Sequence, residues 1–229
     1  MYKLLLVTAL SLSLTSCFDM LEHIVVKPDG SADLRLTISL DSGFIRMMSM
    51  ADFDDSVRSL AAYGDTIGNQ FKDMKKRFDG AKGVKSYDVT YLFEPDSTLI
   101  VRTVIGVDDV LKIPAFHSLF WDIENKDKAN EPSTFPLLFD IRKHKKSGYD
   151  FSFLPRPSLS KKPPKLTKQD TANIGAIEGR TLEIRISAPS VISKANNTDA
   201  VTASWKLPLR ELVLINTNMM KGSALFDRK

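Results

Sequence analysis

The stretch SADLRLTISL, residues 31–40, decides the fold, because polar and apolar side chains alternate along it without a break. Alternation with a period of two predicts a β-strand that buries one face and exposes the other. Residues 22–27 are also strand-like, and Pro28-Asp29-Gly30 between the two stretches supplies a turn in which glycine accepts a positive φ. The chain is therefore expected to begin with a β-hairpin.

Three further pairs of strands are predicted by alternation and by β-branched or aromatic content. They are residues 87–93 with 99–107, residues 135–141 with 149–153, and residues 181–187 with 201–207. Turn residues stand between the members of each pair, at 95–96, 145–148 and 196–197. Hairpins are therefore expected to build most of the sheet.

Two segments have apolar residues at helical spacing, residues 50–61 and residues 67–78. Asp65 or Thr66 is expected to cap the second helix and Gly80 to end it. The stretch from Pro114 to Asn130 has no regular pattern. The sequence thus predicts an α+β fold, a largely antiparallel sheet of about eight strands with a pair of amphipathic helices packed on one face.

The N-terminus has the pattern of an export signal. Lys3 is followed by an apolar run from Leu4 to Leu14, which is too short to span a bilayer. Leu14-Thr15-Ser16-Cys17 then matches the lipobox of bacterial lipoproteins, in which the cysteine thiol accepts a diacylglycerol. We therefore expect residues 1–16 to be a signal peptide and residues 17–229 to form a single domain.

Cys17 is the only cysteine in the chain, so it has no intramolecular disulfide partner, and lipidation gives it a role. Two or three acyl chains anchor a protein stably where one does not. We expect the protein to be membrane-anchored in the cell envelope, outside the cytoplasm. In a cell with two membranes, Phe18 after the cysteine favours the outer one.

The order of these features resembles the LppM-like bacterial lipoprotein domain. The resemblance lies in the lipobox, the turn at Pro28-Asp29-Gly30-Ser31 and a closing block, which runs from LEIRI at residues 182–186 through Ala188-Pro189 and Asn196-Asn197 to VTASWKL at residues 201–207. It covers residues 17–220. The resemblance implies an α+β domain without established enzymatic activity, with suggested roles in binding envelope lipids or glycolipids. Many family members carry a transmembrane helix after the domain, which this chain lacks, so Cys17 is expected to be its anchor.

Catalytic motifs are missing from the sequence. It has no P-loop, no G-x-S-x-G elbow, no G-x-G-x-x-G and no H-E-x-x-H, and its three histidines have no metal-ligand spacing. We therefore predict no enzyme, no cofactor and no metal. Export also makes a nucleic-acid partner improbable.

Basic residues are concentrated between residues 142 and 168, and a Pro/Lys-rich loop is predicted at about residues 155–179. Lysines near a membrane attract anionic headgroups, although a solvated loop would have the same composition. The candidate membrane-contacting or anion-contacting residues are Arg142, Lys143, Lys145, Lys146, Lys161, Lys162 and Lys165.

Two functions remain open on the sequence alone. In the first, sheet and helices enclose an apolar groove for an envelope lipid or another hydrophobic ligand. Its candidate lining residues are Phe71, Met74, Phe78, Tyr91, Phe151 and Phe153, although such positions also suit core contacts. In the second, the domain is a tethered structural or interaction module that docks on another envelope protein or on an anionic membrane surface.

Overall fold

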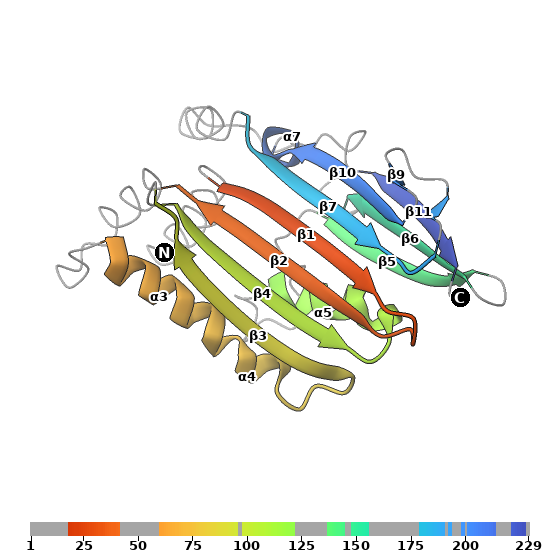
Figure 1. The fold of residues 1–229 in the computed structure, drawn as a ribbon, viewed down its shortest axis with the longest axis horizontal. Helices are drawn as coiled ribbons and strands as arrows, with labels where there is room; N and C mark the ends of the chain where they lie inside the picture. Colours follow the sequence, from red (N-terminus) through yellow and green to blue (C-terminus); the bar gives the residue numbers. More distant parts are fainter. Residues whose placement is uncertain are drawn as a thin grey trace, which may run out of the picture.

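A computed structural model of the 229-residue chain describes the parts of the molecule considered below. The described residues are 18–41, 60–95, 98–121, 137–144, 148–155, 179–190, 192–193, 198–199, 201–213 and 221–227. They form two β-sheets and a layer of helices (Figure 1). The α+β class and the largely antiparallel pairing predicted from the sequence are confirmed, but the strands are divided between two sheets instead of forming one sheet of about eight.

The larger sheet has seven strands in the order β3-β4-β2-β1-β7-β10-β9. Their bounds are β1 Phe18–Val26, β2 Ala32–Leu40, β3 Val84–Phe93, β4 Leu99–Val107, β7 Thr181–Ser187, β9 Thr198–Asp199 and β10 Thr202–Pro208. The predicted hairpins β1-β2 and β3-β4 are confirmed, and β2 pairs with β4 to join them. Gly30 has φ 85° in the first turn, as that turn requires.

A parallel pair of strands joins the two parts of the larger sheet, and the sequence did not predict this pairing. β1 runs parallel to β7, with Ile24 opposite Ile186, and β10 then pairs antiparallel with β7. Every other strand pair in the described residues is antiparallel. β1 therefore lies in the middle of the sheet, between the first hairpin and the last third of the chain.

The smaller sheet has four strands in the order β5-β6-β11-β8. They are β5 Leu137–His144, β6 Gly148–Pro155, β8 Ile192–Ser193 and β11 Gly222–Asp227. The predicted third hairpin is confirmed as β5-β6, whereas β11 was not predicted. Aromatic side chains of β6 pack against Trp205 of β10, so the smaller sheet packs against a face of the larger one and does not continue it edge to edge.

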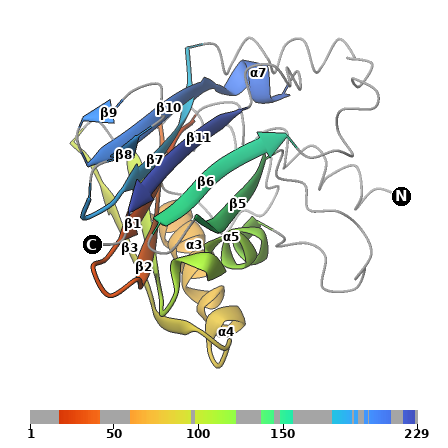
Figure 2. The same cartoon turned by 90° about the vertical axis from the view of Figure 1, so that its right-hand side faces the viewer.

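Helices cover the rest of the inner face of the larger sheet (Figure 2). α3 Leu60–Asp73 and α4 Lys75–Phe78 pack on β3, and α5 Ile113–Trp121 follows the short 3-10 helix η1 Val110–Lys112. The caps predicted at Asp65 and Thr66 are wrong, because both residues lie inside α3. Gly80 follows α4 with φ 77°, as predicted. The first predicted helix, residues 50–61, lies largely outside the described residues.

The predicted irregular stretch from Pro114 is wrong for residues 114–121, which belong to α5. That helix reads IPAFHSLFW, and its apolar residues fall on more than one side. Its buried residues, Ile113, Phe116, His117 and Phe120, lie on one side, but the histidine among them and the apolar Ala115 and Leu119 outside them obscure the amphipathic pattern. No helix within the described ranges is long and apolar enough to cross a membrane.

Candidate functional site

Helix α3 packs along the edge strand β3, and we call this contact the α3-β3 seam. Two tyrosines of β3 form hydrogen bonds to α3 across it. The Tyr91 hydroxyl donates to Asp65 Oδ1 at 3.0 Å, and the Tyr87 hydroxyl donates to the Phe71 carbonyl at 2.8 Å. The hydrogen bond to Asp65 raises the pKa of Tyr91, and burial raises that of Tyr87. Both hydroxyls are therefore neutral donors at physiological pH.

Tyr91 lies flat against α3 because Gly68 has no side chain. A Cβ on Gly68 would come within 2.4 Å of the Tyr91 ring. Asp65, Gly68 and Lys72 lie on one side of the helix, and Lys72 Nζ lies 4.9 Å from the centre of the Tyr91 ring. The Tyr91 side chain thus contacts three residues along one side of α3.

Aromatic side chains continue from this seam into the interior. The ring centres of Phe71 and Phe120 are 6.0 Å apart, and those of Phe78 and Phe116 are 6.2 Å apart. Phe78 also stacks on Tyr87 with a centroid distance of 5.0 Å. Helix α5 therefore connects the helical layer to the region between the two sheets.

A second aromatic group fills the space between the sheets. Trp205 of β10 lies 5.7 Å from Phe151 and 5.4 Å from Phe153, measured between ring centres. Phe139 of β5 completes the group at 5.6 Å from Phe151. The Trp205 indole nitrogen is buried and has no hydrogen-bond partner among the described residues.

One ionisable pair is buried within this apolar interior. Glu22 of β1 is 0% exposed and His117 of α5 is 1% exposed. His117 Nε2 lies 3.1 Å from Glu22 Oε2, and the imidazole stacks on Phe139 with a centroid distance of 3.9 Å. The pair joins the central strand to α5, and no local sequence pattern indicates it because the two residues are 95 positions apart.

The six predicted lining residues fall into two groups. Phe71, Met74, Phe78 and Tyr91 lie along the α3-β3 seam and its extension into α4, whereas Phe151 and Phe153 lie between the sheets. Phe78, Phe151 and Phe153 are at most 1% exposed, so they are core residues in this structure. Phe71 and Tyr91 are only partly buried, which leaves the seam as the accessible part of the predicted lining.

The predicted basic residues are only partly described. Arg142 and Lys143 are exposed on β5, where Arg142 Nε lies 2.7 Å from Asp140 Oδ2. Lys145, Lys146, Lys161, Lys162 and Lys165 lie outside the described residues, and so does the predicted lipidation site, Cys17. β1 begins at Phe18, immediately after that cysteine.

The outer face of the larger sheet carries a polar chain across three strands. His23 Nε2 on β1 lies 2.8 Å from the Ser187 hydroxyl on β7, which lies 2.8 Å from the Thr202 hydroxyl on β10. Burial lowers the pKa of His23, and the neighbouring Arg35 and Arg185 lower it further. The imidazole is therefore neutral at pH 7. No group of three or more potential metal ligands occurs within the described ranges.

The fold and these sites define an α+β domain with an aromatic interior between a large sheet, a small sheet and a helical layer. No family model and no curated protein matches the sequence. The solved folded domain of the LppM protein from Mycobacterium tuberculosis is similar in structure, with a TM-score of 0.50 over 92% of this chain and 89% of that one. The sequences are 10% identical over this match. The chain therefore has an LppM-like fold, as the resemblance implied.

Proposed function

We propose that this protein is a lipid-anchored lipoprotein of the cell envelope whose domain is not an enzyme and binds an apolar envelope molecule. The lipobox at residues 14–17 supports the anchor. The observation that supports binding is the α3-β3 seam, where partly buried aromatic side chains lead from the surface into the interior. Ligand sites are commonly apolar, with a few polar groups that fix orientation.

The seam offers that combination of groups. Phe71 and Tyr91 supply apolar surface, while the Tyr91 hydroxyl, Asp65 and Lys72 supply polar groups at its rim. A lipid fits this arrangement, because its acyl chain would contact the rings and its headgroup would contact the rim. Phe78, which stacks on Tyr87, would then lie beneath the ligand without touching solvent, whereas Phe151 and Phe153 lie in the core between the sheets.

Native mass spectrometry with lipid extraction tests the ligand. The protein would be purified from bacterial envelopes, and we expect a lipid to co-purify in a stoichiometric amount. Phe71→Trp enlarges a partly buried seam residue and is expected to reduce lipid occupancy. Leu154→Trp is the matched control, because Leu154 is 48% exposed on β6. A lipid-free mass for the wild-type protein would exclude this binding function.

Labelled palmitate tests the anchor separately. Replacing Cys17 with serine removes the thiol that accepts the diacylglycerol, so acylation should be lost and the protein should leave the membrane or persist as an uncleaved precursor. A serine variant that still incorporates palmitate would contradict the lipobox assignment.

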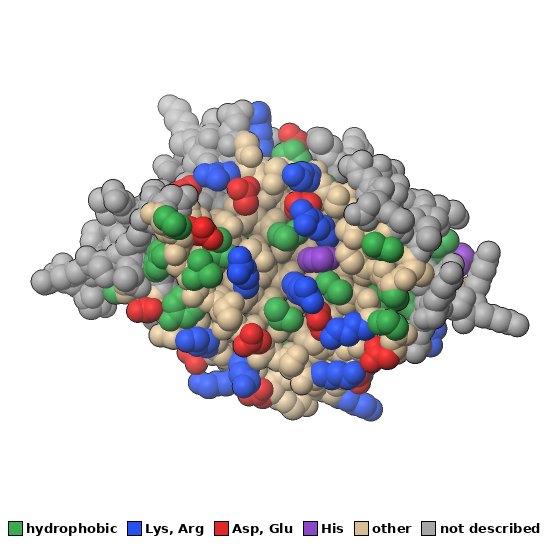
Figure 3. All heavy atoms as spheres, viewed as in Figure 1, with side chains coloured by type: hydrophobic (Ala, Val, Ile, Leu, Met, Phe, Trp, Pro, Cys, Tyr) green, Lys and Arg blue, Asp and Glu red, His purple; other side chains and the backbone are tan. Residues whose placement is uncertain are grey.

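A second candidate function is docking on another envelope component. The observation that favours it is the open outer face of the larger sheet, where charged and apolar side chains lie side by side (Figure 3). This face packs against neither the helices nor the smaller sheet in the described part of the chain (Figure 2).

A further inference from the structure

Four cationic side chains cross the outer face of the larger sheet. Arg35 on β2 and Arg185 on β7 lie on either side of His23 on β1, in register. In the next row, Arg102 on β4 and Lys206 on β10 lie farther out on the same face. Because neighbouring strands are about 4.8 Å apart, Arg35 and Arg185 are about 10 Å apart across the sheet, and Arg102 and Lys206 are about 19 Å apart. Arg35, Arg102, Arg185 and Lys206 are called the cationic band below, and Figure 3 shows this face with its Lys and Arg side chains over the strands.

Two carboxylates of this face are less exposed than the arginines beside them. The Asp33 side chain is 13% exposed beside Arg35 at 49%, and the Glu183 side chain is 14% exposed beside Arg185 at 41%. Each carboxylate is paired with its arginine, at 3.3 Å and 2.6 Å. Asp88 is exposed, but it lies on the edge strand β3, and Asp19, whose side chain is 48% exposed near the start of β1, is paired with Arg180 at 3.4 Å. A partner approaching the middle of the sheet therefore meets cationic groups first.

Two members of the cationic band have no ion pair with any described residue, Arg102 and Lys206, and both are exposed. The lowered pKa of His23 agrees with a positive potential at the centre of the band. Leu21, Val25 and Val104 are partly buried between the charges and add apolar surface. Cations interspersed with apolar side chains suit the interface between lipid headgroups and water.

The position of the anchor determines which anionic surface is near. β1 begins at Phe18, so no spacer separates the predicted lipidated Cys17 from the central strand of the larger sheet. His23 is the sixth residue of that strand. The cationic band thus remains within a few residues of the membrane in which the acyl chains are inserted, where a weak attraction is amplified by effective concentration.

We infer that the cationic band docks the anchored domain on the anionic phospholipid headgroups of its own membrane. This inference rests on the lipid anchor proposed above and adds a membrane-contacting surface to it. The outer face of the sheet lies against the bilayer, whereas the α3-β3 seam is on the inner side of the sheet.

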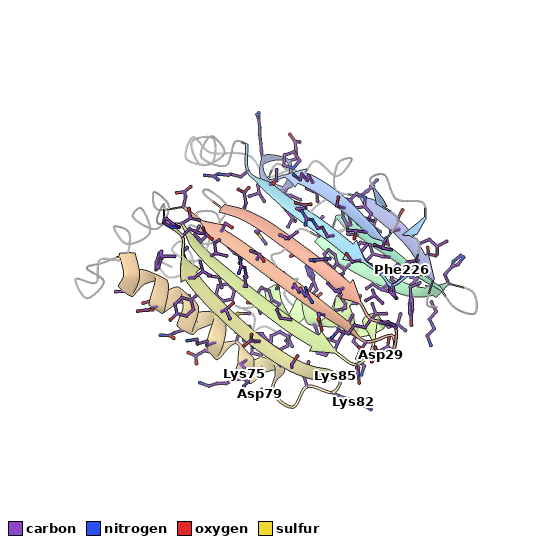
Figure 4. All side chains as sticks on the ribbon, in the orientation of Figure 1. Asp29, Lys75, Asp79, Lys82, Lys85 and Phe226 are labelled. Atoms are coloured by element: carbon purple, nitrogen blue, oxygen red, sulfur yellow. The ribbon has the colours of Figure 1, made fainter. Side chains whose placement is uncertain are left out.

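Other cationic residues lack this arrangement. At the end of the sheet near the β1-β2 turn, cations and carboxylates alternate, with Lys75, Asp79, Lys82, Lys85 and Asp29 near one another (Figure 4). Lys85 Nζ lies 3.9 Å from Asp29 Oδ2. Lys75 and Lys82 are exposed at this mixed end and provide a charge-matched control.

The test uses the acylated full-length protein in phosphatidylcholine vesicles with or without phosphatidylglycerol. Acylation blocks Cys17, the only native cysteine, so Thr37→Cys on the outer face can carry a single nitroxide. Ser223→Cys on β11 of the smaller sheet carries the control label. Electron paramagnetic resonance then measures how far oxygen and a water-soluble nickel chelate reach each label.

We expect the label at position 37 to be shielded from the nickel chelate only when phosphatidylglycerol is present, and the label at position 223 to stay accessible. Arg35→Glu with Arg185→Glu should abolish the shielding, whereas Lys75→Glu with Lys82→Glu should leave it unchanged. If the double arginine variant does not fold, added salt provides the same test on the wild-type protein, because it screens headgroup attraction.

The test distinguishes failure of membrane docking from failure of the lipoprotein proposal. Acylated protein whose label at position 37 stays accessible would overturn docking and leave the lipoprotein proposal intact, whereas protein that is not acylated would overturn both. Equal shielding in pure phosphatidylcholine would exclude a charge-based contact. Shielding that requires an added envelope protein would also overturn membrane docking and identify a protein partner instead.

Discussion

At the scale of single residues, the buried pair Glu22 and His117 is the feature most sensitive to substitution. Removing one partner of a buried ion or hydrogen-bond pair leaves the other desolvated, which costs about 3–5 kcal/mol. Glu22→Ala is therefore expected to lower the free energy of unfolding by about that amount, and Glu22→Gln by less, because an amide oxygen still accepts a hydrogen bond. Urea denaturation measures both changes.

The control for this prediction is Asp73→Ala. Asp73 and Lys76 form an ion pair 3.2 Å long whose side chains are 73% and 80% exposed, and such pairs contribute little. A Glu22→Ala variant no less stable than Asp73→Ala would show that the buried pair does not stabilise the fold.

His23 makes stability depend on pH. Its pKa is lowered from 6.5 in the folded state by burial and by Arg35 and Arg185. As pH falls through about 6.5, the unfolded state takes up a proton before the folded state does, so the free energy of unfolding decreases until the folded pKa is passed. The wild-type protein should therefore lose more stability than His23→Gln between about pH 7.5 and pH 5.5. A parallel His144→Gln variant shows whether any partly exposed histidine has this effect.

At the scale of elements, the attachment of α3 depends on Gly68. Alanine favours a helix by about 1 kcal/mol over glycine, so Gly68→Ala would stabilise an isolated helix. Here the new Cβ would meet the Tyr91 ring, and we expect a net loss of about 1–3 kcal/mol measured by thermal or urea unfolding. Asn69→Ala, at an exposed position of the same helix, should instead be neutral or stabilising. Stabilisation by Gly68→Ala would show that α3 does not lie against Tyr91.

Strand β11 was not predicted from the sequence, and its residue Phe226 packs in the core. Phe226 is 1% exposed and stacks on Tyr149 with ring centres 5.5 Å apart. Phe226→Ala should cost about 3–5 kcal/mol in urea unfolding, because a large buried ring leaves a cavity. Ser223→Ala on the exposed side of β11 should change stability by less than about 0.5 kcal/mol. Equal effects would mean that β11 is not docked.

At the scale of the whole molecule, the sequence predicted the hairpins well and their assembly poorly. Alternation at residues 31–40 and 181–187 predicted strands that the structure confirms. Local periodicity cannot specify which hairpins share a sheet, and the parallel pairing of β1 with β7 joins residues about 160 positions apart. The packing of Trp205 against β6 across the two sheets is likewise a long-range contact that no local pattern reveals.

The candidate site was predictable to a similar degree. Helical spacing and strand alternation placed Phe71 and Tyr91 correctly on the inner side of α3 and β3. The same patterns could not separate them from Phe151 and Phe153, since periodicity reports which side of an element is buried and not what covers it. The cationic band was missed because Arg35, Arg102, Arg185 and Lys206 are far apart in the sequence and meet only through strand order.

The central place of β1 also bears on the export that the proposed signal peptide would require. Its two neighbours in the sheet are β2 and β7, so its pairing is incomplete until residues 181–187 are available. Long-range pairing of this kind slows folding. On the proposed export route, β1 of the precursor would still lack its partner β7 when the N-terminus enters a secretion channel. The same topology would thereby delay folding until after export, which is the state that such a channel accepts.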